Sequence, residues 1–238
     1  MNDMSPSGLP STAVDLETTP LRELHEALHA LSPDTNRTLW HVANPRGRHA
    51  VAVGLTVPVQ VTIDGHVGYY AAGMNQRARV VINGNAGTGV AENMMSGEVR
   101  VRGNASQSAG ATGRGGLLVI EGDAGARCGI SMKGIDIVVR GSVGHMSAFM
   151  AQEGNLVVCG DAGDALGDSL YEARLFVRGQ VKSLGADCEE KRMGGQEQAI
   201  LEDLLARAGV DDADPGAFRL YGSARRLYHF HVDNANAY

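Results

Sequence analysis

Seven glycines recur at intervals of 19 residues through the middle of the chain, and this period limits the possible folds more than any other feature. A fixed period of about 20 residues is typical of a solenoid, in which each repeat forms one coil. The set consists of Gly65, Gly84, Gly103, Gly122, Gly141, Gly160 and Gly179.

Each of these glycines is preceded by a pair of aliphatic residues, four and two positions earlier. Residues two apart on a strand share one face, so every repeat is predicted to contain a short strand with an aliphatic inward face. The pairs are Val61 and Ile63, Val80 and Ile82, Val99 and Val101, Leu118 and Ile120, Ile137 and Val139, Leu156 and Val158, and Leu175 and Val177. The position before each glycine is mostly polar and is expected to face solvent.

The glycine is interpreted as a corner, where the chain needs either a positive φ or close backbone approach. The second residue after it is always Ala or Val, and the seventh is always Ala or Gly, as in Val67 and Ala72 of the first repeat. Small residues at equivalent places allow one coil to lie directly on the next. Strands about 4.8 Å apart would then give a column about 30 Å tall over seven coils.

We therefore predict an all-β fold, a right-handed parallel β-helix of about seven 19-residue coils with flanking N- and C-terminal helices. The expected divisions are a disordered N-terminus (1–14), an N-terminal helix with leading strands (15–58), the β-helix (59–193), and a C-terminal helix with an aromatic docking tail (194–238). Two other interpretations of the glycines fit less well. A calcium-binding β-roll requires nonapeptide repeats, whereas the acidic run at 160–169 occurs once, and a dinucleotide-binding loop at 84–92 would require a helix directly after it.

Both flanking segments contain an apolar stripe at helical spacing. Thr19 and Pro20 are predicted to open the first helix, and its stripe consists of Leu21, Leu24, Leu28 and Leu31. The runs TLWHV and HAVAVGLTVPVQVT, within 38–62, are interpreted as strands. The second helix is predicted over 196–208, with Gly209 as its stop. The two helices are expected to cover the open ends of the column, and the tail with Tyr221, Tyr228, Phe230 and Tyr238 to dock on the column or on another subunit.

Composition excludes several classes of function. A net charge of −6, one Trp and four Phe argue against nucleic-acid binding. No apolar run approaches about 20 residues and no secretion signal is visible, so a cytoplasmic location is expected. Cys128, Cys159 and Cys188 lie far apart in the sequence and form no metal-binding motif, so we interpret them as reduced structural thiols.

The repeats resemble the GXGXG domain, the β-helix at the C-terminus of the glutamate synthase large subunit, which also occurs as one of the subunits of formylmethanofuran dehydrogenase. Over about residues 15–238, the chain is similar to the stand-alone glutamate-synthase-like subunit of N-methylglutamate synthase. The phrases that carry this likeness are DLETTPLRELHEALHAL, NPRGRHAVAVGL, GYYAAGMN, GVAENMMSG, GATGRGGLLVIEG, CGISMKGIDIVVRG, GHMSAFMAQ, CGDAGDALGDSLYEARLFVRG and VKSLGADC. Lys182 replaces the second glycine in the last repeat, as expected at the end of a stack.

The resemblance implies a complex of three kinds of chain that makes N-methylglutamate and ammonia from methylamine and glutamate. One partner would be a class II glutamine amidotransferase-like subunit, and the other a glutamate-synthase-like subunit that carries FMN and an iron–sulfur cluster. The chain itself is expected to hold no cofactor and no metal, and to be a non-catalytic scaffold. It lacks an N-terminal Cys nucleophile, a flavin phosphate loop and a four-cysteine cluster site.

No catalytic residue is therefore predicted. His66 and His145 follow corner glycines and are interpreted as turn residues. Several loop residues are unusual for a bare surface, and we predict either that they form a partner interface or that the methionines plug the column. The candidate interface consists of Met94, Met95, Arg114, Met132, Lys133, Met146, Phe149 and Met150.

Two other functions are compatible with parts of the sequence. The same fold in the GXGXG-bearing subunit of a formylmethanofuran dehydrogenase or formyltransferase/hydrolase-type complex would differ only in its partner subunits. A secreted β-helix enzyme acting on polysaccharide would require a signal peptide, more aromatic residues and a carboxylate cluster on one face, and the sequence shows none of these.

Overall fold

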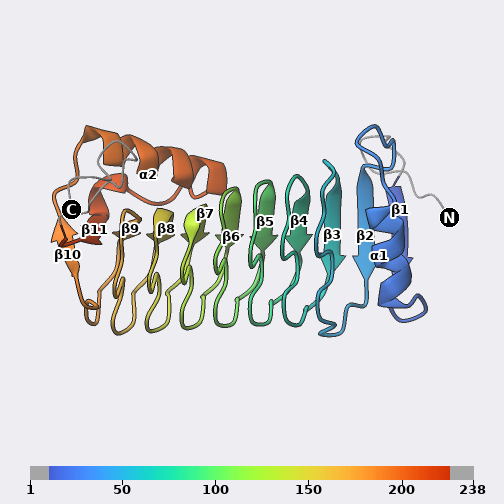
Figure 1. The fold of residues 1–238 in the computed structure, drawn as a ribbon, viewed down its shortest axis with the longest axis horizontal. Helices are drawn as coiled ribbons and strands as arrows, with labels where there is room; N and C mark the ends of the chain where they lie inside the picture. The colour runs from blue at the N-terminus through green and yellow to red at the C-terminus, as the bar shows by residue number, and fades with distance from the viewer. Residues whose placement is uncertain (1–10, 226–238) are drawn as a thin grey trace, which may run out of the picture.

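The computed structural model describes residues 11–225 and consists of one long β-stack with two helices (Figure 1). The N-terminal part contains β1 (Ser11–Asp15), α1 (Leu21–His29) and β2 (Leu39–Ala43). The repeats supply β3 (Gln60–Asp64), β4 (Arg79–Ile82), β5 (Glu98–Val101), β6 (Leu117–Ile120), β7 (Lys133–Val139), β8 (Glu153–Val158) and β9 (Arg174–Val177). The C-terminal part contains β10 (Cys188–Lys191), α2 (Gly195–Ala208), a short 3-10 helix (Pro215–Ala217) and β11 (Arg219–Ser223).

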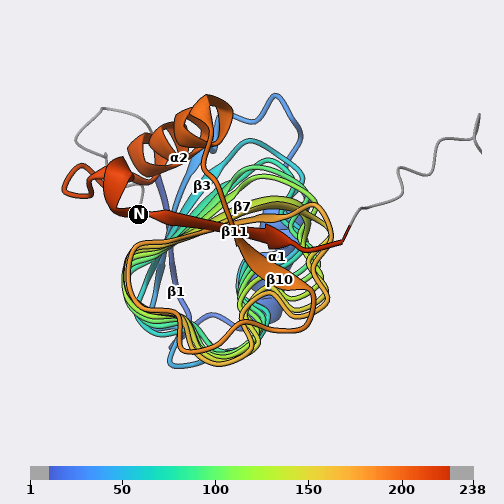
Figure 2. The ribbon, with the colours of Figure 1, turned by 90° about the vertical axis from the view of Figure 1, so that its left-hand side faces the viewer.

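The strands form a single sheet in the order β1 to β9, then β11 and β10, and the strands from β1 to β9 all pair in parallel. From β3 onward, residues 19 apart are register partners, as in Val61, Val80 and Val99. A second ladder of bridges joins the residues two positions after each corner glycine, from Val67 to Val181. The predicted parallel β-helix is confirmed, and Figure 2 shows the coils superposed when viewed along the column.

The inward strand residues form the core that the sequence pattern predicts. All fourteen predicted aliphatic residues are completely buried, and they belong to one continuous cluster that runs the length of the column. Stacking therefore places each aliphatic side chain on its counterpart in the next coil, which removes nearly all its apolar surface from water.

The corner glycines are required mainly because the coils approach closely, since only Gly65 of the seven has a positive φ (136°). A Cβ atom on Gly122 would lie 2.1 Å from Asn104 Oδ1 and 2.9 Å from the carbonyl oxygen of Gly103. The N–H of Gly122 donates to that same carbonyl at 3.0 Å. Each corner thus rests on the corner of the preceding coil.

The residue after each corner glycine forms a ladder of side-chain-to-backbone hydrogen bonds. Its side chain accepts from the N–H of the equivalent residue one coil later, at 2.8 Å from Asn104 N–H to Asn85 Oδ1 and 2.7 Å from Ser142 N–H to Asp123 Oδ1. The complete ladder runs through His66, Asn85, Asn104, Asp123, Ser142, Asp161 and Gln180. Short polar side chains at this position are therefore structural.

The rest of each coil, from the third to the twelfth residue after the corner glycine, is called here the turn side. Its backbone takes left-handed conformations at alternate residues, such as Tyr70, Ala72 and Met74, with φ values of 58°, 53° and 54°. Their N–H groups alternate between neighbours, with Tyr70 and Met74 donating to the following coil and Ala72 to the preceding one. The residue at the seventh position must be small because it is left-handed and also faces the packed core. A Cβ on Gly110, for example, would lie 2.6 Å from Ile137 Cδ1.

The N-terminal segment differs from the sequence-based prediction in three respects. Residues 11–14, predicted to be disordered, belong to β1. The parallel stack therefore begins with β1 and β2, on the N-terminal side of the predicted start at residue 59. The run at 49–55 forms turns instead of a strand, because Ala50 and Ala52 are left-handed. Pro20, not Thr19, is the N-cap of α1.

The helix α1 covers the N-terminal end of the column, as predicted. Leu24 and Leu28 are buried in the main core, and Leu21 and Leu31 pack against it. The apolar stripe of this helix is therefore satisfied within the chain.

The helix α2 begins and ends where the sequence indicates, with Gly209 left-handed at its C-terminus (φ 70°), but it does not cover the end of the column. It lies lengthwise against the outer face of the sheet over the last strands (Figures 1 and 2). Leu201, Leu204 and Leu205 form a second core with outward residues such as Val138 and Val157. Cys159, which was predicted to face solvent, is buried in this core.

The C-terminal end of the stack is closed by antiparallel strands. β11 pairs with β9 on one side and with β10 on the other, and it crosses the end of the column in Figure 2. Tyr221 on β11 is buried, whereas Tyr228, Phe230 and Tyr238 lie outside the described residues. Neither described α-helix is long and apolar enough to cross a bilayer.

The corner contact predicts that Gly122→Ala destabilises the column by about 1–3 kcal/mol, because the added methyl group overlaps the preceding coil. Gly195→Ala in α2 is the matched control, since a Cβ there meets nothing within 4 Å. Thermal unfolding followed by circular dichroism measures both. Equal midpoints for the two variants would contradict the close-approach argument.

We expect Arg100 to contribute to the stability of the contact between α2 and the sheet. Its buried guanidinium forms ion pairs with Glu98 and Glu121 and donates to the Ala208 carbonyl oxygen at 3.0 Å. Arg100→Met leaves these acceptors with fewer partners and is expected to lower the free energy of unfolding by about 3 kcal/mol. Arg22→Met, which breaks the exposed Arg22–Glu26 pair, should cost less than about 0.5 kcal/mol. Denaturant titration of both variants tests this difference.

Candidate functional site

The described residues do not converge on a catalytic constellation. No group of three or more His, Cys, Asp or Glu side chains within residues 11–225 is placed to hold a metal ion. The acidic run at 160–169 is used locally instead. Asp161 belongs to the corner ladder, and Asp164 pairs with Lys182, whose hydrogen bond holds the pKa of that carboxyl below its usual range.

The three cysteines are free and buried, in agreement with their interpretation as structural thiols. Burial raises the pKa of Cys128 to about 12 and that of Cys188 to about 11, and it also raises the pKa of Cys159. A reactive cysteine requires a stabilised thiolate and access to solvent, and these environments provide neither.

The two histidines that follow corner glycines occupy turn positions. His66 Nδ1 accepts from the N–H of Asn85 at 2.9 Å, which makes it the first member of the corner ladder. His145 is exposed, and its carbonyl oxygen accepts from the N–H of Arg127. Asp164 lies within electrostatic reach of His145, but no hydrogen bond joins either histidine side chain to a described acid or nucleophile, as a general base would require.

The structure divides the predicted interface residues into two groups. Met94 and Met132 are completely buried inside the column, so for these two the alternative prediction, that methionines plug the column, is correct. The remaining six reach the surface of the turn side. Met95, Arg114 and Met150 are exposed, and Lys133, Met146 and Phe149 are half-buried.

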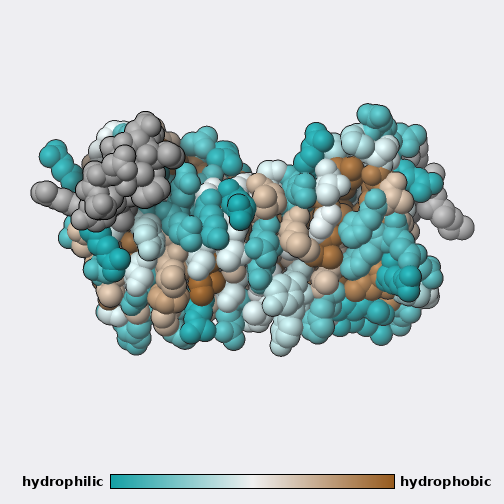
Figure 3. Space-filling model, in the orientation of Figure 1, coloured by the Kyte–Doolittle hydropathy of each residue, from teal (hydrophilic) through white to brown (hydrophobic). Residues whose placement is uncertain are grey.

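A second surface was not identified from the sequence. α2 covers the outer face of the sheet only over its C-terminal strands, and Figure 3 shows the molecule hollowed beyond the helix. On the uncovered strands the charges neutralise one another, through Arg79–Glu98 and Arg102–Glu121 ion pairs. A shallow depression with a mostly apolar surface lies at the start of β2 and β3, where Leu39, Pro58 and Val59 are among its lining residues.

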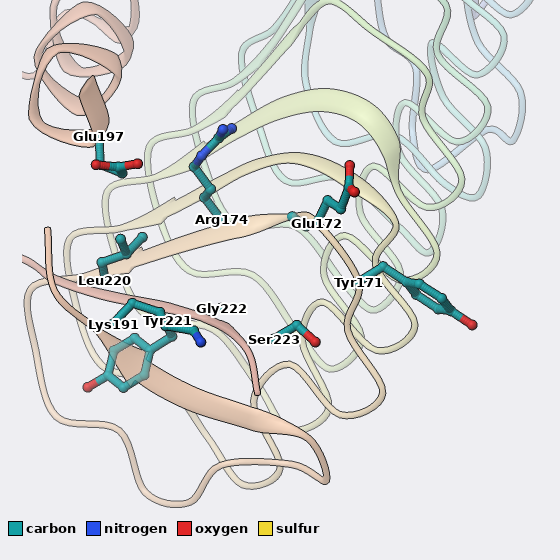
Figure 4. A pocket seen from close by; sticks show the side chains of 10 residues that line it. Tyr171, Glu172, Arg174, Lys191, Glu197, Leu220, Tyr221, Gly222 and Ser223 are labelled. Atoms are coloured by element: carbon teal, nitrogen blue, oxygen red, sulfur yellow. The ribbon is translucent and has the colours of Figure 1, made fainter. Parts of the chain in front are cut away.

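A third surface is a pocket at the C-terminal end of the stack (Figure 4). Arg174, Lys191, Glu197 and Tyr221 line it, so it brings together β9, β10, α2 and β11, while Tyr171 points away from the others. Burial raises the pKa of Tyr221. No sequence signal indicated this pocket, because its residues are scattered between 171 and 223 and meet only when the strands pair.

The shape of this pocket is unlike that of an enclosed active site. Its volume is 220 Å³ and it is open to solvent, whereas small-molecule sites typically enclose about 300–1,000 Å³. Its charged groups have both signs, and Lys191 is already paired with Glu189. The pocket therefore suits a polar contact with another surface better than enclosure of a substrate.

The cysteine environments predict very slow thiol labelling of the native protein. At pH 8, iodoacetamide should modify Cys128, Cys159 and Cys188 only after unfolding in guanidinium chloride, since burial excludes the reagent and suppresses the thiolate. Mass spectrometry of native and denatured samples measures the modification. Rapid labelling of a native thiol would indicate an accessible, activated cysteine.

No protein-family model matches the chain. The chain is similar to Protein GlxC of Rhizobium meliloti (strain 1021), with 64% identity over 225 residues, which cover 94% of this chain and 99% of that protein. Because this identity extends over nearly the whole of both proteins, the chain belongs to the GlxC family.

Proposed function

We propose that the chain is a structural, non-catalytic subunit of a glutamate-synthase-like enzyme complex. The observation that carries this proposal is the column itself, whose core is filled by side chains and whose described surface shows no convergent catalytic groups. A rigid rod with regular faces is well suited to hold other subunits in register.

The specific complex that we propose is N-methylglutamate synthase, which would convert methylamine and glutamate to N-methylglutamate and ammonia. The sequence phrases shared with its stand-alone glutamate-synthase-like subunit support this assignment. The partners would be an amidotransferase-like subunit and a subunit that carries FMN and an iron–sulfur cluster. The cofactors are assigned to that partner because the described cysteines here are buried and separate.

Geometry supports a scaffolding role in a second way. The stack from β3 to β9 contains seven rungs about 4.8 Å apart, which is long enough to contact two subunits at once. A scaffold of this kind would align two partner sites so that a reactive amine passes between them without escaping.

The proposal predicts an activity that needs this chain but does not need the imidazole of His66 or His145. In a complex reconstituted from the three subunits, synthesis of N-methylglutamate should fall at least about tenfold when the chain is omitted. His66→Asn, which keeps an acceptor for the corner ladder, and His145→Asn should retain the activity of the unsubstituted complex.

Native mass spectrometry of the complex purified from its own host checks the partners and the flavin content together. We expect the amidotransferase-like and flavin-bearing subunits in the assembly and no flavin on the isolated chain. Flavin or iron–sulfur cluster on this chain would contradict the non-catalytic role. Association with formylmethanofuran dehydrogenase-type subunits would replace the proposed complex with that alternative.

A further inference from the structure

One row of side chains on the turn side differs from the rest of the surface. The eleventh residue after each of the first six corner glycines lies where the turn side meets the next strand, whereas the equivalent residue after Gly179 is Glu190 in the antiparallel β10. Consecutive members are one rung apart, so the row is about 24 Å long. From the N-terminal end it consists of Gln76, Met95, Arg114, Lys133, Gln152 and Tyr171.

The backbone fixes the centre of this row. Arg114 donates its N–H to the Met94 carbonyl oxygen, and Lys133 donates to that of Gly113, both at 2.7 Å. Glycines surround the two cations, since Gly113, Gly115 and Gly134 have no side chains that could cover them. The two positive groups are therefore held on neighbouring rungs and remain open to a partner.

Neither cation is neutralised within the described chain. Among residues 11–225, Arg114 and Lys133 make no side-chain hydrogen bond or ion pair. Glu153 is the register partner of Lys133 in β8, yet the two form no ion pair. Like charges on adjacent rungs destabilise a sheet, so stability of the column does not explain their placement.

The sheet side shows the opposite arrangement. Arg79, Arg100 and Arg102 all pair with Glu98 or Glu121. The chain carries a net charge of −6, so acidic residues are plentiful, yet no ion pair joins a described acidic residue to Arg114 or Lys133, and this includes Glu153 beside Lys133. Arg114 and Lys133 thus differ from the arginines of the sheet side in being two unpaired cations on consecutive rungs.

Exposed apolar side chains extend this site. Met95 is the next member of the row and is 44% exposed, and Met74 on the same side is 51% exposed. Arginine and methionine are enriched at the centres of protein interfaces, where methionine adapts its shape to the partner.

We propose that three members of this row, Met95, Arg114 and Lys133, form the docking site for an acidic segment of a partner subunit. This inference rests on the proposed function. The charge identifies the chemistry of the occupant. Two carboxylates at rung spacing would meet the two cations, with Arg114 able to bind one of them in a bidentate manner. An apolar side chain beside the acidic residues would cover Met95.

The test uses the full chain and the two proposed partner subunits. Arg114→Glu/Lys133→Glu is compared with Arg37→Glu/Arg192→Glu, which changes the net charge equally at exposed positions near the two ends of the column. At low salt, the first variant should bind the partners at least about tenfold more weakly, and added salt should change its affinity less than that of the unsubstituted chain. The control variant should bind within about twofold of the unsubstituted chain.

Two further measurements separate the outcomes. A photoreactive benzophenone amino acid at position 95 should cross-link to a partner peptide rich in Asp and Glu, and circular dichroism should show an unchanged fold for both charge variants. If the unsubstituted chain assembles and Arg114→Glu/Lys133→Glu binds equally well, the docking site is wrong and the proposed function stands. If the unsubstituted chain does not assemble with these subunits, both proposals are wrong.

Discussion

Consecutive coils of this column meet backbone to backbone at their corners, and no side chain fits between them. A Cβ on Gly122 would lie 2.1 Å from Asn104 Oδ1 and 2.9 Å from the carbonyl oxygen of Gly103, and similarly close approaches recur at the other corners from Gly84 to Gly179. This contact sets the register, and the register then places aliphatic on aliphatic in the core and short polar residues in the corner ladder. The glycines recur every 19 residues in the sequence because each coil makes this contact once.

The two sides of the column are stabilised differently: α2 packs against part of the sheet side, whereas the turn side depends mainly on backbone hydrogen bonds between coils. On the sheet side, α2 buries the outward residues of the last strands, and ion pairs neutralise the uncovered ones. On the turn side, alternate left-handed residues send hydrogen bonds to the coils before and after. Much of that backbone is satisfied by other backbone groups, with side chains such as the buried Asn75 completing it in places. Many outward turn-side positions therefore take no part in holding the coils together, and Arg114, Lys133 and the exposed methionines occupy such positions.

Part of the candidate site followed from the sequence, and part did not. Met95, Arg114 and Lys133 could be placed on the loop side because their positions within the repeat are fixed. Burial of Met94 and Met132 could not be derived, because burial along the turn side does not follow the two-residue period of a strand: Tyr69 and Tyr70 are both exposed, and the next residues, Ala71 and Ala72, are both buried. The C-terminal pocket depends on antiparallel pairing of β9, β11 and β10, and nothing local in the chain specifies that pairing.

The sequence by itself determined the coil, because close packing at the corners and burial of the strand aliphatics each demand a particular residue type at a fixed period. It also determined the bounds of the second helix to within one residue, with its stop at Gly209, and the apolar stripe of the first helix. Only the tertiary structure decided where α2 lies, and that β1 and β2 belong to the stack. The physical reason is that the sequence of a helix or short strand shows that its apolar face must be buried, but not against which surface. That surface exists only once the column has assembled.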